Sequence, residues 1–258
     1  MNTTTSLLYD GSFEGFLTAV FTVFERKLDN VTITTSIAYS SASLFCTEIQ
    51  VYTEKDKAER VWNALVQKIR KKQYARIFQA FLSEQSGIED LLLRAIQYIF
   101  SCSANTANDY SHPDILAIAQ ITRKIHRERH RMEAFIRFEH TKEDMYVATI
   151  EPDFNVIPLL SDHFEKRYAD QKWLIYDVQR SYGIYYDLEK VEVISFLEDS
   201  KLKGKISSNV LSDSEKGFQK LWKTYYTNVN ISSRNNKKLH FQHVPKRYWK
   251  YLTEKHVI

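Results

Sequence analysis

Glycine and proline are both scarce in this sequence, with six glycines and four prolines among 258 residues. Typical proteins contain about 7% glycine and about 5% proline. Neither G-x-G-x-x-G nor G-x-x-x-x-G-K-[ST] occurs. These absences argue against a Rossmann dinucleotide site and against a phosphate-binding P-loop.

Cysteine is almost absent as well, and the two that occur, Cys46 and Cys102, form no C-x-x-C pair. An iron–sulfur cluster or a zinc site built on cysteines therefore lacks its ligands, and we expect neither a metal nor another cofactor in this chain. The N-terminus carries no basic segment, and no apolar run approaches the roughly 20 residues of a membrane span. We expect a cytoplasmic protein that does not contact a membrane.

The net charge of +4 conceals an uneven distribution along the chain. Residues 216–258 contain ten basic residues and one acid, so this segment carries +9 and residues 1–215 carry −5. Eight aromatic residues are interspersed with these cations. Cations neutralise phosphates and exposed rings stack on unpaired bases, so the segment has the composition of a nucleic-acid surface. The alternative is that the lysines lie on solvated faces while the rings fill a core.

A second basic cluster lies on the helix predicted from about Pro113 to Met132. Arg123, Arg127 and Arg131 recur every four residues, with Lys124 beside them, and form a ridge along one face. This ridge can follow a phosphate backbone, or it can be a solvated face paired with acids.

The hydrophobic pattern indicates an α+β fold. Residues 1–130 show mostly helical spacing, after a short strand at residues 7–9 and a helix capped by Ser12. Residues 131–258 combine helical stretches with alternating ones, which predicts a mainly antiparallel sheet with packed helices. The two regions can also form one continuous domain. The predicted strands cover residues 134–138, 145–150, 173–178, 184–188 and 191–197. The predicted helices cover residues 54–82 (two helices), 91–100, 156–168 and 212–226, the last with Phe218, Leu221, Trp222 and Tyr225 on one side.

Two groups of residues could support catalysis. His163 and Arg167 share one side of the helix predicted over 156–168, and Asp177 and Arg180 follow at the end of the next strand. This group could bind a phosphate, with His163 and Asp177 as catalytic candidates, or it could be a buried ion pair that fixes the helix on the sheet. Asp199 and Lys201 match the D-x-K half of a metal-dependent nuclease motif. The alternative is a solvated charged turn that matches this short motif by chance.

Several segments together resemble a bacterial family of DNA-metabolism or DNA-repair proteins whose molecular function is unknown. The segments are Tyr9-Asp10-Gly11-Ser12-Phe13-Glu14-Gly15-Phe16-Leu17, Phe135-Ile136-Arg137-Phe138, His163-Phe164 with Arg167, Trp173-Leu174-Ile175-Tyr176-Asp177 with Arg180, Leu221-Trp222-Lys223-Thr224-Tyr225-Tyr226, Arg234-Asn235 and Pro245-Lys246-Arg247-Tyr248-Trp249. The resemblance runs over nearly the whole chain, and the last segment is its most specific mark.

The resemblance implies a partner, because members of this family are encoded beside a radical SAM protein described as a DNA modification or repair enzyme. Related domains are fused to uracil-DNA glycosylase-type domains. This chain lacks the G-Q-D-P-Y loop of the glycosylase, so base excision does not transfer. The family has no established catalytic residues, so the resemblance implies none here.

We therefore expect a DNA-binding accessory protein in DNA repair or DNA metabolism that acts with the radical SAM protein. A DNA-processing enzyme, either a nuclease or glycosylase-like, and a protein–protein adaptor without nucleic-acid binding are the alternatives. The predicted nucleic-acid-binding residues are Arg123, Lys124, Arg127, Arg131, Arg137, Arg167, Arg180, Lys223, Arg234, Lys246, Arg247, Tyr248 and Trp249. Of these, Tyr248 or Trp249 is expected to stack on a displaced base.

Overall fold

The computed structural model describes residues 4–36, 46–102, 106–195, 209–229 and 237–255. The chain divides into two compact units, residues 1–125 and residues 126–258. The 23-residue helix α5 (Pro113–Phe135) contributes its first part to the first unit and its last part to the second.

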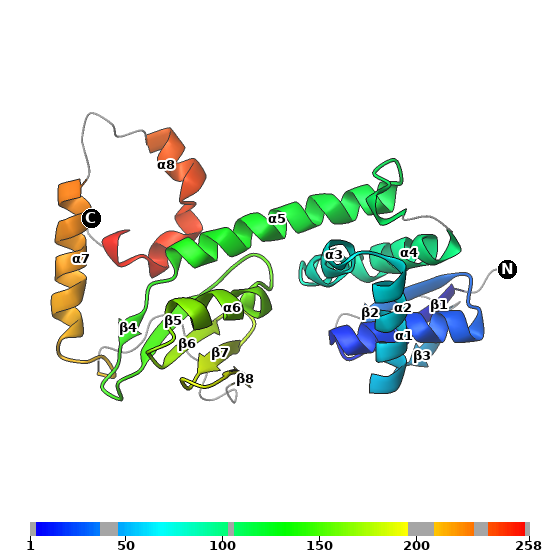
Figure 1. Ribbon diagram of the computed structural model, residues 1–258, viewed down its shortest axis with the longest axis horizontal. Helices are drawn as coiled ribbons and strands as arrows, with labels where there is room; N and C mark the ends of the chain where they lie inside the picture. The colour runs from blue at the N-terminus through cyan, green and yellow to red at the C-terminus, as the bar shows by residue number, and fades with distance from the viewer. Residues whose placement is uncertain (1–3, 37–45, 103–105, 196–208, 230–236, 256–258) are drawn as a thin grey trace. The chain divides into compact units, whose positions relative to one another are not determined.

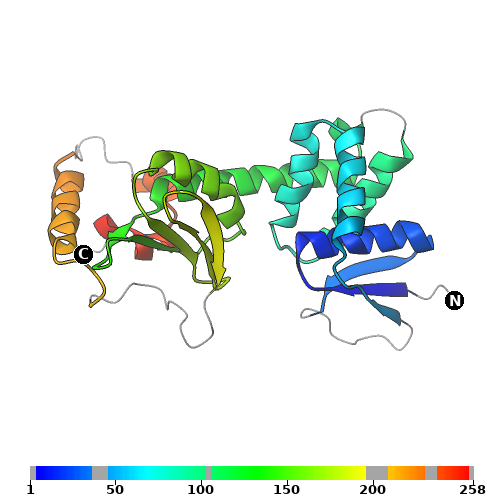
Figure 2. The same cartoon turned by 60° about the horizontal axis from the view of Figure 1, so that its bottom comes forward.

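The first unit contains a small parallel sheet with helices on one face. Ser12 begins the first helix, because its side chain accepts a hydrogen bond from the Gly15 backbone N–H at 2.9 Å. Figure 2 shows this helix, α1, running along one face of the three strands. The elements are β1 (Thr4–Tyr9), α1 (Phe13–Arg26), β2 (Val31–Thr35) and β3 (Cys46–Gln50), and the strand order is β2-β1-β3.

Three further helices complete this unit together with the start of α5. The stretch at 54–82 forms two helices, as predicted, and the third covers the predicted helix at 91–100. The pairing of β2 and β3 with β1 was not predicted, since both are short and rich in polar residues. The helices are α2 (Lys55–Lys68), α3 (Lys71–Phe81) and α4 (Ile88–Ser101), followed by a 3-10 turn at Thr106–Asn108.

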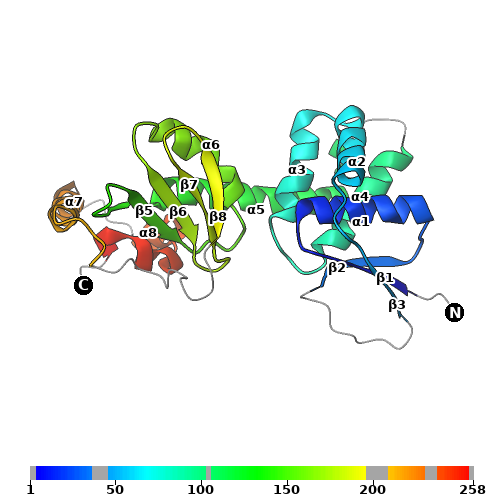
Figure 3. The same cartoon turned by 90° about the horizontal axis from the view of Figure 1, so that it is seen from below.

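The second unit is built on a five-stranded sheet. Three of its four strand pairings are antiparallel, and the parallel pair β5–β6 is joined through α6, which lies on one face of the sheet (Figure 3). This confirms the predicted α+β fold. The elements, with strand order β4-β5-β6-β7-β8, are β4 (Glu139–His140), β5 (Tyr146–Ile150), α6 (Ile157–Arg167), β6 (Trp173–Asp177), β7 (Tyr182–Tyr186) and β8 (Val191–Ser195).

The strand predicted at residues 134–138 is wrong. Helix α5 continues to Phe135, and the Ile136 N–H still donates to the Met132 carbonyl at 3.0 Å. Met132 and Ile136 are both buried at helical spacing, so the helical period continues into the apolar run that suggested a strand. Only Glu139 and His140 pair with β5.

The C-terminal segment is helical. Helix α7 stands beside the β4 edge of the sheet (Figure 1), and the bridge between Thr141 and Leu211 attaches the chain just before it. The elements are α7 (Glu215–Val229), α8 (Lys237–His243) and 3-10 turns at Lys246–Tyr251 and Thr253–Lys255. Among the described residues, no helix combines the length and the apolar composition needed to span a membrane.

Gly183 is required by the close approach of β7 to β6. A Cβ atom at Gly183 would lie 2.3 Å from the Ile175 carbonyl oxygen and 3.0 Å from the Tyr176 Cα. We expect Gly183→Ala to lower the free energy of unfolding of the second unit by about 1–3 kcal/mol, measured by urea denaturation. Gly217→Ala is the matched control, since nothing lies within 4 Å of that position and alanine favours a helix. A Gly183→Ala protein as stable as the wild type would contradict this packing.

Candidate nucleic-acid interface

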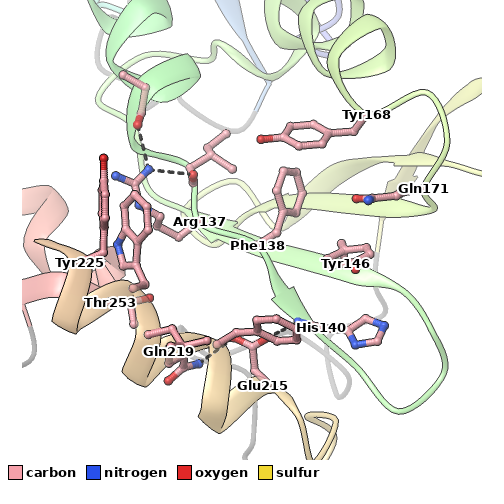
Figure 4. Close-up of a pocket in the computed structure, with 15 residues that line it drawn as sticks. Arg137, Phe138, His140, Tyr146, Tyr168, Gln171, Glu215, Gln219, Tyr225 and Thr253 are labelled. Carbon is pink, nitrogen blue, oxygen red and sulfur yellow. Dashed lines mark hydrogen bonds between the residues drawn. The ribbon is translucent and has the colours of Figure 1, made fainter.

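A cavity of about 850 Å³ opens in the second unit between the β4 edge of the sheet and α7. Figure 4 shows Phe138 and Tyr146 on the strand side, facing Gln219 and Tyr225 on α7. We call this cavity the aromatic groove because six rings line it: Phe138, Tyr146, Tyr168, Phe218, Trp222 and Tyr225. Its polar lining consists of Arg137, His140, Gln171, Glu215, Gln219 and Thr253.

The rings on α7 are unusually exposed. Phe218, Leu221 and Tyr225 are 61%, 66% and 58% exposed, respectively. Together with Trp222 they recur at helical spacing and form one apolar face. The prediction of a one-sided apolar helix is correct, but much of this face is left open to solvent beside the groove.

Glu254 connects α7 to the segment that follows α5. It accepts a hydrogen bond from the Trp222 indole at 2.9 Å and from the Arg137 guanidinium at 2.9 Å. That guanidinium also lies 5.4 Å from the Trp222 ring centroid. Burial alone would raise the pKa of Glu254, but these two hydrogen bonds hold it below its usual value. The contacts fix one wall of the groove.

Glu215 forms the polar end of the groove. Its carboxylate is buried and accepts the His140 backbone N–H at 3.0 Å and the Gln219 side-chain amide at 3.0 Å. His140 stacks on Tyr146 and hydrogen-bonds Ser212 and Asp144 through its two ring nitrogens. The start of α7 is thereby tied to β4 and to the turn that follows it.

The predicted arginine ridge lies on α5. Arg123 and Lys124, in the first unit, and Arg127, in the second, are exposed and form no ion pair among the described residues. Arg131 lies 3.7 Å from the Glu128 carboxylate. The ridge is therefore solvated along most of its length, with one member next to an acid.

Arg247 and Tyr248 both contact carboxylates, although the Arg247 side chain remains 40% exposed. The Arg247 guanidinium contacts Glu128 at 2.9 Å and Asp153 at 2.8 Å, and the Tyr248 hydroxyl donates to Glu128 at 2.6 Å. Burial, together with the hydrogen bond to Glu128, raises the Tyr248 pKa. Tyr248 is only 2% exposed, so its ring is inaccessible to a displaced base in this structure.

Asp177 and Arg180 form a buried ion pair with each other at the end of β6, and neither partner belongs to α6. Asp177 is 0% exposed, and its carboxylate accepts a hydrogen bond from the Arg180 guanidinium at 2.8 Å. The guanidinium also donates to the carbonyl oxygens of Pro152 and Asp153, and so fixes the loop after β5. Burial raises the pKa of Asp177 in spite of this pairing. An inaccessible, paired carboxylate is unsuited to act on a substrate.

His163 and Arg167 share α6, as predicted, but the described residues show no hydrogen bond or ion pair between His163 and Asp177. His163 instead packs edge-on against Phe164 and lies near the Glu133 carboxylate. Arg167 is exposed at the end of α6, directly before the groove residue Tyr168.

The remaining predicted residues are dispersed. Lys223 is half-buried on α7, Lys246 lies over the Phe241 ring, and Trp249 stacks on Phe241 while its indole donates to the Val244 carbonyl. Arg234, Asp199 and Lys201 lie outside the described residues. Searched over the described ranges alone, the chain contains no group of three His, Cys, Asp or Glu side chains that could hold a metal ion.

Sequence reasoning missed the groove itself. It assigned Phe218, Trp222 and Tyr225 to one side of a helix, and the available signal was that this apolar face lies within the most basic part of the chain. Glu215 and the rings on the strand side carry no local signal, because only the fold brings β4, β5 and α7 together.

Comparison with known proteins identifies a family. No curated protein shows significant sequence similarity to the chain. A similar solved structure, the pGpG-specific phosphodiesterase PggH from Vibrio cholerae, is 9% identical and covers 89% of this chain and 100% of its own, with a TM-score of 0.33. A similarity this weak supports no argument about fold or function. A family model matches residues 86–254, well over half of the sequence. The chain therefore belongs to the family described as a domain of unknown function, DUF4130.

Proposed function

We propose that this protein binds single-stranded DNA and that the aromatic groove receives unpaired bases. The observation that carries this proposal is the set of six rings around one open cavity, several of them on an exposed helix face. A base that stacks on an aromatic side chain gains about 1–3 kcal/mol, and the cavity volume suits a small number of nucleotides.

Cations near the groove support contacts with the DNA backbone. Arg167 and Lys172 are exposed on either side of the segment that supplies Tyr168 and Gln171 to the groove. Lys216 and Lys220 are exposed on α7, on the side opposite to its rings. A helix is about 10 Å wide, so these charges still act on phosphates at the groove within about one Debye length.

A titration of oligothymidine followed by fluorescence anisotropy tests the proposal. We expect binding to the single strand that weakens as salt rises, and weaker binding to a duplex of the same length, whose bases are already stacked. Absence of binding at low salt, or equal affinity for both forms, would contradict the proposal.

Arg167 should contact a phosphate and not a base. We expect Arg167→Ala to lower affinity for every single-stranded sequence alike and to reduce the slope of log K against log salt by about 0.7. Arg60→Ala, an exposed arginine of the first unit that lies over the Phe21 ring, is the control and should leave the slope unchanged. An unchanged slope in Arg167→Ala would remove this residue from the interface.

An accessory role in DNA repair or DNA metabolism beside a radical SAM enzyme extends this proposal. The resemblance in the closing Pro245-Lys246-Arg247-Tyr248-Trp249 segment and in the other shared segments supports it. Co-expression of the two proteins and affinity purification tests this role. We expect the radical SAM protein to co-purify in the presence of nuclease, and its absence from the purified fraction would limit the proposal to DNA binding.

A protein–protein adaptor is the second candidate, and the exposure of Leu221 favours it, because an aliphatic side chain gains little from a nucleobase. The two candidates differ in their response to salt. An adaptor that buries the apolar face of α7 binds its protein partner with little salt dependence and does not bind oligothymidine.

A further inference from the structure

Glu215 is a buried carboxylate that has no cationic partner in the described parts of the chain. The residue is 6% exposed, and the described residues place no lysine or arginine in an ion pair with it. Its two oxygens accept one neutral donor each, from the His140 backbone N–H and from the Gln219 amide. An ionised carboxylate offers about four acceptor positions, so about half remain for a ligand in the groove that Glu215 lines.

Gln219 adds a second acceptor at the same end of the groove. Its amide nitrogen donates to Glu215 at 3.0 Å and to Glu139 at 3.2 Å. Both N–H groups of the amide are therefore occupied, and the carbonyl oxygen is the group left for a ligand. Glu215 and Gln219 together present only acceptors, so they match a ligand edge that carries N–H donors.

Guanine is the base whose pairing edge best fits this end of the groove. It presents two adjacent donors, N1–H and the 2-amino group, which a carboxylate accepts side by side. Adenine and cytosine place a ring-nitrogen acceptor beside their amino group, and thymine places its single N–H between two carbonyl oxygens. Each of those acceptors would face the negative charge of Glu215 and repel it.

We infer that Glu215 makes the aromatic groove selective for guanine among unpaired bases. This inference rests on the proposed function, since it names the base that the same groove prefers. The rings supply stacking that is independent of base identity, and Glu215 supplies the discrimination. A well-placed bidentate contact discriminates by about tenfold or more.

Oligothymidines that carry one central guanine, hypoxanthine or adenine test this selectivity by fluorescence anisotropy at a single salt concentration. Hypoxanthine keeps N1–H and lacks the 2-amino group, so it removes one donor without changing the protein. We expect the guanine oligonucleotide to bind about tenfold more tightly than the hypoxanthine, adenine and all-thymine forms.

The Glu215→Gln variant completes the test. Its amide oxygen can still accept the His140 N–H, but the loss of charge should lower the affinity for the guanine oligonucleotide to that for the hypoxanthine and adenine forms. Glu143→Gln, which removes the same charge from an exposed turn of the same unit, should keep the preference. Circular dichroism establishes that both variants are folded.

The outcomes separate this inference from the proposed function. Equal binding of guanine and hypoxanthine by the wild-type protein overturns the inference, whether or not the variant folds, and leaves DNA binding standing. Retention of the guanine preference by a folded Glu215→Gln protein also overturns it. Failure of every oligonucleotide to bind contradicts the proposed function and the inference together.

Discussion

Replacing Phe218 and Tyr225 together with serine is expected to lower affinity for single-stranded DNA about a hundredfold. Each ring that stacks on a base contributes about 1–3 kcal/mol, so the loss of two costs about 2–6 kcal/mol, and a hundredfold change corresponds to about 2.7 kcal/mol. Both side chains are more than half exposed, so their removal leaves no buried cavity and the protein should remain folded. Anisotropy with oligothymidine measures the change.

The matched control for this variant removes exposed rings from elsewhere in the chain. Tyr52 and Tyr110 lie in the first unit and are 77% and 46% exposed. Their joint replacement with serine should change affinity less than twofold. Equal losses in the two double variants would mean that the rings of α7 have no special role.

Loss of the Glu128 carboxylate is expected to destabilise the second unit by about 3–5 kcal/mol. Glu128 is 1% exposed and accepts the Tyr248 hydroxyl, the Arg247 guanidinium and the Asp153 backbone N–H. Glu128→Ala leaves these donors without their acceptor and opens space in the core. Three of the four tryptophans lie in this unit, and the fourth is Trp62. In a Trp62→Phe background, tryptophan fluorescence during urea denaturation therefore reports on the unfolding of the second unit alone.

Arg127→Ala is the control for Glu128→Ala, because Arg127 is exposed on the same helix and its removal should cost less than about 0.5 kcal/mol. A loss below about 1 kcal/mol in Glu128→Ala would show that the network around this carboxylate contributes little to stability. Such a small loss would also mean that Glu128 holds Arg247 only weakly, which would leave Arg247 available to contact DNA.

Local features of the sequence predicted the elements that depend on nearby residues. Ser12 and the apolar stripe that follows it identified α1, since a cap and a helical period both act within a few residues. The polar strand β2 escaped prediction because its place is determined by pairing with β1. The apolar run at 134–138 fits either a strand or a helix. Helix α5 extends into it because Met132 and Ile136 are buried at helical spacing.

Features that join distant segments could not be predicted. Tyr248 and Glu128 are 120 positions apart, and nothing near either residue in the sequence indicates that the two form a buried hydrogen bond. The stripe on α7 was visible as an apolar face, but whether such a face meets a core or remains open depends on the whole fold. Arg137 and Arg247 were selected for their charge alone, so their carboxylate partners, Glu254 and Glu128, were not predicted.

Photocrosslinking of the wild-type protein to an oligothymidine that carries one 5-iodouracil tests the central claim most directly. The iodinated base reacts with aromatic side chains that it touches, and mass spectrometry then locates the modified residue. Attachment to Phe218, Trp222 or Tyr225 is the predicted result. Crosslinks confined to the first unit, or to aromatic residues outside the groove, would contradict the account.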